Sequence, residues 1–388
     1  MLSKAQANWK GRKFLLVHSS AELYGSDRCL LSIVQGLLDR GAVAHVAVPA
    51  SGALVYELEK VGARVHILDT VVFRRDVLSA GGMTRLLLRT PWSVARLIRL
   101  MRRERYDLVH TNTGVTVGGA IAARLSGIPH VWHFREILSE FGLFLRFYQQ
   151  FVNALSRRLI FITGAVRDQF SSQRIRKKGR VIHDGIPVEE YEGNLPEADD
   201  GSIIVTSVGR LAPYKGQYIL IDAIAKAVDQ GIDLQAFIVG DVYGERHEYR
   251  EELMSQASRL GLAERVQFTG FVDDVLPFLE KCNLFILAST RPEGLGIVML
   301  EAMAAGRAVI ATNGGGAREI ITDGEDGLLV PPGDSELMAK AIVRLANDRE
   351  TRHRLAAAGN EKVKSRFSKQ AMVDNILELY EEILTARQ

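Results

Sequence analysis

Short apolar runs alternate with stretches of helical composition along nearly the whole of this chain, in two successive series. The runs of the first series are residues 14–18, 45–49, 65–68, 108–111, 130–133, 159–163 and 181–182. Those of the second are residues 203–208, 235–239, 266–268, 284–288, 308–311 and 328–330. Strands separated by helices are typical of parallel sheets that are covered on both faces. The sequence therefore predicts an α/β protein with two Rossmann-like, doubly wound domains.

A polar segment that contains Gly and Pro, residues 190–201, separates the two series and is typical of a linker. Ser368 is expected to cap a last helix that runs to about residue 384. The expected parts are a first domain, a linker, a second domain and a terminal helix, over residues 1–190, 191–201, 202–367 and 368–388. Doubly wound sheets bind ligands at the carboxyl ends of their strands, so two facing sheets predict a ligand cleft between domains.

Two carboxylates, Glu293 and Glu301, bracket the loop and helix that follow the run at 284–288. The residues expected at the helix start are Gly294, Leu295, Gly296 and Ile297. Free N–H groups and the positive end of the helix dipole make such a start favourable for a diphosphate. Eight residues of helix turn roughly 80° past two full revolutions, so the carboxylates cannot form a close pair on one face. We expect Glu293 in the loop beside the ligand, and Glu301 farther along, where it suits the hydroxyl pair of a ribose.

A second loop with phosphate-binding chemistry leaves the run at 203–208. It reads GRLAPYKG over residues 209–216 and enters a helix near Gln217. Arg210 offers a planar fork of donors and Lys215 a compact charge, and both suit phosphate oxygens. When a sugar–nucleotide bond breaks, a nucleoside diphosphate departs, and fixed cations aimed at it stabilise the charge that develops. Taken alone the loop could be an ordinary solvated basic turn, whereas together the two loops indicate a diphosphate-directed site.

The combination of a strand, GRLxxxKG and, farther along, EGxGxxxxE resembles the retaining, metal-independent glycosyltransferases of family GT4, which have the GT-B fold. The segment VIHDGIP at 181–187 is similar to the family's turn ahead of the second domain, with Asp184 where Asn is usual. The resemblance covers nearly the whole chain. It implies two Rossmann-like domains that face one another across a cleft, a nucleotide sugar bound as donor, and a C-terminal helix that crosses back to the first domain.

The resemblance also implies site residues. His133 resembles the family histidine beside the donor sugar, and the expected catalytic residues are His133, Arg210, Lys215 and Glu293. Gly25 stands where the family has a glycine pair. The expected donor-binding residues are Gly25, Arg210, Lys215, Val272, Glu293, Gly294, Leu295, Gly296, Ile297 and Glu301. The first domain is expected to carry the acceptor, at Ser26, Asp27, Asn112, Arg135 and Glu136.

Simpler explanations remain open for the residues of the first domain. Ser26 and Asp27 suit helix caps as well as an acceptor site. Arg135 and Glu136 could form a local ion pair, and a lone histidine at a strand end is often a core residue. No residue is an obvious nucleophile. For retaining enzymes of the resembled type, the acceptor would attack the face that the leaving group vacates, and the diphosphate would take up its proton.

Other chemistries fit the sequence poorly. It contains no GxxxxGK[ST] loop and no GxGxxG after a strand, which disfavours an NTPase or a nicotinamide enzyme. It contains no Asp-x-Asp, and its histidines have no ligand spacing, so we expect no metal and no cofactor. Cys29 and Cys282 fall in different halves of the chain without neighbouring cysteines, so neither a disulfide framework nor a zinc site is implied. Residues 1–13 lack the apolar segment of a signal peptide and no run is long enough to cross a bilayer, so we expect a cytoplasmic location.

Positive charge is concentrated in the first half of the chain, since residues 1–190 carry a net charge of +13 and residues 191–388 carry −10. Much of the excess lies between Arg85 and Arg105, among leucines and Trp92, and Pro91 is expected to start a new helix there. Basic amphipathic segments lie well on anionic bilayers, although a solvated helix face is the alternative. No nucleic-acid-binding module accompanies the segment, so no nucleic-acid partner is expected.

Together these patterns predict a cytoplasmic, hexosyltransferase-type glycosyltransferase, peripheral on the inner face of the membrane. It is expected to add a sugar to a glycan or lipid-linked acceptor in envelope polysaccharide or glycolipid biosynthesis. Two alternatives stay open. One is an isomerase or epimerase of the same fold, which would consume a nucleotide sugar without transfer. The other is a non-catalytic two-domain sugar-binding protein, which the cationic loops and the absent signal peptide oppose.

Overall fold

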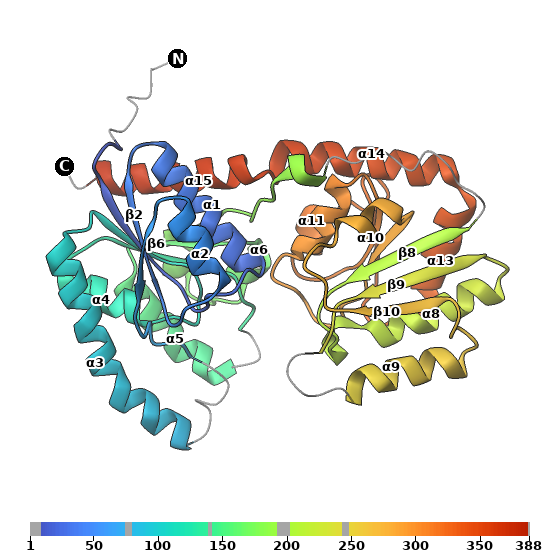
Figure 1. Ribbon diagram of the computed structural model, residues 1–388, viewed down its shortest axis with the longest axis horizontal. Helices are drawn as coiled ribbons and strands as arrows, with labels where there is room; N and C mark the ends of the chain where they lie inside the picture. The colour runs from blue at the N-terminus through green and yellow to red at the C-terminus, as the bar shows by residue number, and fades with distance from the viewer. Residues whose placement is uncertain (1–8, 74–79, 139–141, 192–201, 243–247, 387–388) are drawn as a thin grey trace, which may run out of the picture. The chain divides into compact units, whose positions relative to one another are not determined.

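The computed structural model describes residues 9–73, 80–138, 142–191, 202–242 and 248–386. It divides into two compact units, each built around its own parallel sheet (Figure 1). The first unit comprises Met1–Gly185 together with Lys369–Gln388, and the second comprises Ile186–Ser368. The prediction of two Rossmann-like α/β domains is confirmed by these sheets. Nearly all of the predicted linker, residues 192–201, lies outside the described residues.

The sheet of the first unit has seven strands in the order β3-β2-β1-β4-β5-β6-β7, and every pairing is parallel. The strands are β1 Lys13–Val17, β2 Val43–Val48, β3 Arg64–Ile67, β4 Leu108–Thr111, β5 His130–Phe134, β6 Arg158–Phe161 and β7 Gly179–Val181. The strand order reverses between β1 and β4. The loops that leave β1 and β4 therefore diverge, and the carboxyl edge at such a switch point is where a doubly wound sheet binds ligands.

Helices cover both faces of this sheet (Figure 1). They are α1 Gly25–Asp39, α2 Ala53–Lys60, α3 Ala80–Glu104, α4 Gly118–Ser126, α5 Gly142–Leu155, α6 Gly164–Asp168, α7 Gln173–Lys178 and α15 Lys369–Thr385. Helix α1 packs against α2 and α15, whereas α4 packs against α3 and α5. Apolar side chains of β1, α3, β4 and α4 form one continuous core cluster under α3.

The second unit has a six-stranded sheet in the order β10-β9-β8-β11-β12-β13, again parallel throughout. The strands are β8 Ile203–Val208, β9 Leu234–Val239, β10 Val266–Gly270, β11 Leu284–Leu287, β12 Ala308–Thr312 and β13 Leu328–Val330. The helices are η3 Val188–Tyr191, η4 Pro213–Lys215, α8 Gln217–Asp229, α9 Glu248–Arg259, α10 Leu276–Lys281, α11 Ile297–Ala304, α12 Ala317–Ile320, α13 Ser335–Asn347 and α14 Arg349–Arg366. Here the switch point lies between β8 and β11.

The C-terminal helix α15 returns to the first unit, as expected. Its apolar stripe is buried, at Met372, Ile376, Leu379 and Ile383. Gly36 on α1 lets α15 approach closely, because a Cβ at this position would lie 2.3 Å from Cγ1 of Val373. Tyr380 stacks on Phe14 of β1 at a centroid distance of 5.6 Å. The close helix contact and the buried aromatic pair anchor the end of the chain to this sheet.

One predicted boundary is wrong. Pro91 does not start a new helix but lies inside α3, which runs without interruption from Ala80 to Glu104. Proline lacks the N–H that would continue the hydrogen-bond ladder. The hydroxyl of Thr90 donates to the carbonyl of Leu86 at 2.7 Å, which supplies an extra hydrogen bond in the same turn. The buried stripe of α3 (Val94, Leu97, Met101) then holds the helix against the sheet despite the proline.

Candidate functional site

The two phosphate-directed loops meet at the carboxyl edge of the second sheet. The loop after β8 carries Arg210 and Lys215, and the loop after β11 carries Glu293. They are joined by a backbone hydrogen bond, because the N–H of Thr290 donates to the carbonyl of Tyr214 at 2.8 Å. Since β8 and β11 flank the switch point, the strand order itself brings the two sequence motifs together.

Lys215 and Glu293 form an ion pair, with Nζ 2.8 Å from Oε2, and their side chains are only 20% and 16% exposed. Ser289, at the end of β11, donates its hydroxyl to the other carboxylate oxygen of Glu293. The carbonyl of Ser289 in turn accepts from Oγ1 of Thr312 at 2.7 Å. A cation, a carboxylate and two hydroxyls at the ends of three strands, β8, β11 and β12, are therefore fixed in one connected arrangement.

Two glycines make this arrangement sterically possible. Gly216 has φ +71°, and a Cβ there would lie 2.0 Å from the carbonyl oxygen of Ala288, so the Lys215 loop could not lie against the end of β11 with any other residue. Gly315 has φ +56°, and its Cβ would lie 2.1 Å from the carbonyl oxygen of Glu293. The neighbouring N–H of Gly316 donates to that carbonyl at 3.0 Å. The glycines thus fix the backbone on both sides of the ion pair.

Arg210 is exposed, and its loop is anchored through backbone atoms. Its carbonyl accepts from Nε2 of Gln217 at 2.9 Å, and the N–H of Leu211 donates to the carbonyl of Asp241 at 3.0 Å. Val272 lies half-buried after β10, at the same edge of the sheet. Arg210 is therefore held at its backbone while its side chain reaches toward solvent.

Helix α11 starts where the sequence predicts. Gly296 is its N-cap, with φ +86° and no side-chain cap, ahead of Ile297. Gly294 and Leu295 precede it in the loop. Glu301 lies within the helix and is 9% exposed, and its Oε1 accepts from the hydroxyl of Tyr191 at 3.0 Å. Glu293 and Glu301 are thus separated between loop and helix, and their separate roles toward a sugar and a ribose remain predictions.

A second group of polar side chains lies at the switch point of the first unit, beyond β1 and β4. Nε2 of His18 lies 2.5 Å from Oδ1 of Asp27, and the hydroxyl of Ser20 donates to the same oxygen at 2.5 Å. Nδ2 of Asn112 lies 3.3 Å from Nδ1 of His18 and donates to the carbonyl of Ser26 at 3.2 Å. Burial opposes the charge of Asp27, but the His18 and Ser20 contacts and the N–H of Tyr24 lower its pKa overall.

Asp27 also caps the start of helix α1. Its Oδ2 accepts from the N–H of Tyr24 at 2.9 Å, so it closes a capping box at the start of α1. Asp27 is nevertheless completely buried and binds His18 and Ser20 as well. Gly25 opens the same helix. Asp27 is therefore a helix cap and also a member of the polar group, while its expected role in binding the acceptor remains a prediction.

Arg135 does not pair with its neighbour Glu136. Its Nη1 donates to both carboxylate oxygens of Asp184, and its Nη2 donates to Oδ1 of Asn112 at 3.1 Å. Burial opposes the positive charge, but the Asp184 carboxylate raises the pKa of Arg135 overall. Asp184 is the position at which the resembled family has Asn. The buried guanidinium of Arg135 needs an anionic partner, which explains why this chain has a carboxylate at position 184.

Glu136 is held by backbone donors instead. Its Oε2 accepts from the N–H of Gly114 at 2.9 Å and from the N–H of Arg135 at 3.2 Å. Desolvation raises the pKa of Glu136, although these hydrogen bonds and the charge of Arg135 act against the shift. The alternative of a side-chain ion pair between Arg135 and Glu136 is therefore wrong. Each residue has a separate partner, and Glu136 ties the loop after β4 to the end of β5.

His133 lies inside the core of the first unit, one residue before the end of β5. Its ring packs edge to face against His110 at 5.4 Å, and neither of its ring nitrogens has a hydrogen-bond partner among the described residues. Desolvation, together with the charge of Arg135, lowers the pKa of His133 well below its ordinary value. The structure thus places a neutral, fully buried imidazole here, and the expected role beside the donor sugar remains a prediction.

Sequence reasoning missed three residues of these groups. His18 and Ser20 follow β1 directly, where their residue types alone do not distinguish a site from a loop. Ser289 follows the apolar run of β11 directly, ahead of Thr290. All three lie at carboxyl ends of strands beside a switch point, and that position is the signal that could have identified them.

No helix among the described residues combines the length and apolar character needed to span a bilayer. In the same part of the chain, no three His, Cys, Asp or Glu side chains are grouped so that they could hold a metal ion.

Two known families match consecutive parts of the chain. Residues 24–190 match the family described as Glycosyltransferase Family 4, and residues 193–362 match the one described as Glycosyl transferases group 1. The lipopolysaccharide core biosynthesis glycosyltransferase LpsE of Rhizobium meliloti is 38% identical over 176 residues, which are 45% of this chain and 49% of LpsE. The chain therefore matches about half the length of that relative.

Longer matches cover both units. LpsD of Rhizobium meliloti, also described as a lipopolysaccharide core biosynthesis glycosyltransferase, is 28% identical over 381 residues, or 97% of this chain and 100% of LpsD. The crystal structure of HepE from Anabaena in complex with UDP is similar with a TM-score of 0.81 and 29% identity. That match covers 95% of this chain and 100% of HepE.

Proposed function

The chain belongs to the family 4 glycosyltransferases, and from this membership we propose that it transfers a glycosyl group from a nucleoside diphosphate sugar to a glycan or lipid-linked acceptor. The observation that carries the proposal is the arrangement at the carboxyl edge of the second sheet. There Lys215 contacts Glu293 in the loop that leads into α11, and Arg210 stands in the same loop as Lys215. Cations beside a helix N-terminus are suited to a departing diphosphate.

In this proposal, Lys215 has two alternative partners. Before the donor binds, its ammonium neutralises Glu293. When a diphosphate arrives, Lys215 and Arg210 turn to the phosphate oxygens, and Glu293 becomes free to accept hydrogen bonds from the hydroxyls of the sugar. Ser289 keeps the carboxylate of Glu293 in place during this exchange. Glu301 accepts from the ribose hydroxyls in the same proposal.

The chemical step is proposed to occur with retention and without metal. The bond between the anomeric carbon and the diphosphate oxygen breaks, and the acceptor oxygen bonds to the anomeric carbon on the face that the diphosphate leaves. The acceptor proton passes to the departing diphosphate, so that no enzyme nucleophile is needed. Arg210 and Lys215 supply the positive charge that stabilises the leaving group.

The relatives suggest where to look for the two substrates. HepE has been solved with UDP and with UDP-glucose, which supports uridine diphosphate sugars as the first donors to test. LpsE and LpsD are named for lipopolysaccharide core biosynthesis, which supports an envelope glycan or glycolipid as the acceptor. The polar group of the first unit, His18, Ser20, Asp27 and Asn112, is the proposed binding site for an acceptor hydroxyl.

A membrane-bound acceptor also suits the surface of α3. Leu88 and Trp92 lie one helical turn apart and are 75% and 72% exposed. Exposed arginines continue the same face at spacings of three or four residues, at Arg85, Arg96, Arg99 and Arg103. An apolar pair set among arginines is typical of helices that lie at an anionic membrane surface. We therefore propose that the protein is cytoplasmic and binds the inner face of the membrane through α3.

A panel of nucleotide sugars tests the proposal. Each is screened for thermal stabilisation of the full chain, and those that stabilise it are assayed for release of nucleoside diphosphate with and without a lipid-extracted acceptor. The proposal requires at least one donor whose sugar appears on the acceptor. Consumption of a donor with no transferred sugar would favour the isomerase alternative, and binding without consumption would favour the non-catalytic one.

A further inference from the structure

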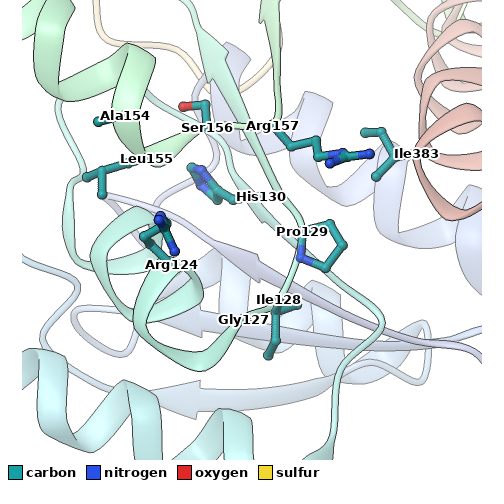
Figure 2. Close-up of a pocket in the computed structure, with 10 residues that line it drawn as sticks. All are labelled: Arg124, Gly127, Ile128, Pro129, His130, Ala154, Leu155, Ser156, Arg157 and Ile383. Atoms are coloured by element: carbon teal, nitrogen blue, oxygen red, sulfur yellow. The ribbon is translucent and has the colours of Figure 1, made fainter. Parts of the chain in front are cut away.

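A cavity of about 310 Å³ lies at the amino edge of the first sheet, where the turns into β5 and β6 meet the end of α15 (Figure 2). Its walls include Ile128, Pro129, Leu155 and Ile383, so most of the surface is apolar. The volume is at the lower end of the range typical of small-molecule sites. The cavity is separate from the polar groups described above, because β5 runs from His130 in its lining to Phe134 beside Arg135, a distance of roughly 13 Å over four residue steps.

Two exposed arginines border the cavity from different elements. Arg124 belongs to the last turn of α4 and Arg157 to the turn between α5 and β6, and Figure 2 shows them on opposite sides of His130, with the Arg157 side chain extended toward Ile383. Neither arginine has an ion-pair partner among the described residues. None of the lining residues is acidic. The cavity therefore combines apolar walls with two positive charges that the described part of the protein does not neutralise.

The surroundings keep this site basic. Glu382, the neighbour of Ile383 on α15, is engaged by Arg180 with Nη2 2.7 Å from Oε1. Lys178 donates to the carbonyls of Asn153 and Ser156, at 2.6 and 3.3 Å, and so holds the turn that carries Arg157. Desolvation, with the charges of Arg158 and Arg174, lowers the pKa of Lys178. Because Glu382 is paired with Arg180, it does not neutralise the arginines of the cavity.

One hydroxyl of the lining is also unsatisfied. Oγ of Ser156 is buried and has no hydrogen-bond partner among the described residues. Buried polar groups are nearly always hydrogen-bonded, so an unpaired hydroxyl in a cavity wall marks a place for a ligand oxygen. His130 adds no charge, because burial lowers its pKa to about 3, and its Nε2 is already bonded to Oγ1 of Thr111 at 2.9 Å.

We propose that this cavity is a binding site for a small organic phosphate ester, distinct from the donor and acceptor sites. A phosphate monoester presents three terminal oxygens, enough for the forks of both Arg124 and Arg157, whereas a carboxylate presents two. The organic part of the ester lies against Ile128, Pro129 and Ile383. Because Ile383 belongs to α15, an occupied site adds contacts between the C-terminal helix and the body of the first unit.

The test measures binding of phenyl phosphate to the full chain by calorimetry, with benzyl alcohol as the uncharged probe. Phosphate also suits the donor loops, so the starting protein carries Arg210→Gln and Lys215→Gln. Adding Arg124→Gln and Arg157→Gln to it should weaken phenyl phosphate at least tenfold. The matched control, Arg146→Gln with Arg174→Gln, removes the same charge from exposed positions outside the cavity and should leave the affinity unchanged.

A cavity-filling variant gives an independent result. Ala154 is exposed and lines the cavity, so Ala154→Trp can occupy it without changing charge or core packing. It should abolish phenyl phosphate binding while the thermal unfolding midpoint without ligand stays within a few degrees of the parent. Equal weakening by the two arginine pairs, undiminished binding to the Ala154→Trp variant, or equal binding of benzyl alcohol would overturn the proposal.

Discussion

The ammonium of Lys215 lies 2.8 Å from the carboxylate of Glu293, so the two loops that carry the family's sequence motifs are joined by their functional side chains. The pair is mostly buried, so breaking it leaves each charge without a partner at a place that water solvates poorly. A diphosphate that draws Lys215 away must therefore compete with Glu293. The affinity for the nucleotide therefore depends on Glu293, although the proposal assigns Glu293 to the sugar.

The first prediction follows from this competition. Glu293→Gln should bind a bare nucleoside diphosphate as well as wild type or more tightly, because Lys215 is no longer neutralised, while sugar transfer falls at least tenfold. Glu301→Gln should instead weaken the bare nucleotide, since it would lose the charged acceptor for the ribose. Titration calorimetry with UDP compares the two variants. A weaker Glu293→Gln and an unchanged Glu301→Gln would show that the two roles are reversed.

The second prediction concerns the buried pair of Arg135 and Asp184. Asp184→Asn removes the partner of a buried guanidinium, which typically costs about 3–5 kcal/mol in the free energy of unfolding. The double variant Arg135→Met with Asp184→Leu removes both charges and should recover most of that loss. Trp9, Trp92 and Trp132 all belong to the first unit, so urea unfolding followed by tryptophan fluorescence reports on the correct part of the protein. Equal stabilities of Asp184→Asn and wild type would contradict the pair's importance.

The third prediction is a loss of stability in mild acid. Burial lowers the pKa of His110 and His133 well below the ordinary value of 6.5, and that of His130 to about 3. The unfolded chain therefore takes up protons below about pH 6.5 that the folded protein refuses, and the free energy of unfolding falls with pH by about 1.4 kcal/mol per unit for each such histidine. The pKa of Asp27 is lowered in the folded protein, so its contribution to the free energy of unfolding is lost only below about pH 4.

Urea midpoints between pH 8 and pH 5 measure this slope. His133→Leu offers the matched comparison, because neither ring nitrogen of His133 has a partner to lose among the described residues. The variant should be as stable as wild type at pH 8 and should show a shallower slope. The same variant tests the expected place of His133 beside the donor sugar, since a residue needed only for packing would leave sugar transfer intact. A midpoint that does not move with pH would contradict the assignment of neutral buried histidines.

The fourth prediction concerns α3. Changing Arg96, Arg99, Arg102 and Arg103 to Gln should release the protein from phosphatidylglycerol vesicles at low salt, and 0.5 M salt should release wild type in the same way. Trp92 is exposed, so its fluorescence should shift to the blue on binding. A control that loses Arg146, Arg158, Arg174 and Lys177, four exposed cations elsewhere in the first unit, should still sediment with vesicles. If the two variants sedimented with the vesicles to the same extent, α3 would be an ordinary solvated helix.

The elements of this fold were predictable because strand and helix composition alternate so regularly. Every predicted run coincides with a strand of one of the two sheets, and Gln217 indeed begins α8. The failure at Pro91 has a physical cause, since local rules place proline at a helix start while the buried stripe of α3 keeps one continuous helix. Tertiary packing outweighs the local preference there.

The candidate site was predictable only where a motif carried it. Arg210, Lys215 and Glu293 stand in recognisable sequences, and the strand order brings them together. His18 and Ser20 carry no such pattern, and their contact with Asp27 depends on how the loop after β1 folds back. Asp184 was visible as a departure from the resembled family, but its reason, the charge of Arg135, lies 49 residues away in the chain. Pairwise compensation of this kind becomes visible only in the structure.

The most direct test of the account is to follow a donor by phosphorus NMR during turnover, with wild type, Arg210→Ala and Lys215→Ala. If Arg210 and Lys215 stabilise the leaving group, wild type should release nucleoside diphosphate in step with glycosylated acceptor. Each alanine variant, still folded, should release it at least tenfold more slowly, because charge-assisted hydrogen bonds to the leaving group contribute about 1.5–3 kcal/mol each. Unchanged rates in both variants, or release of nucleoside monophosphate with sugar phosphate, would contradict the account.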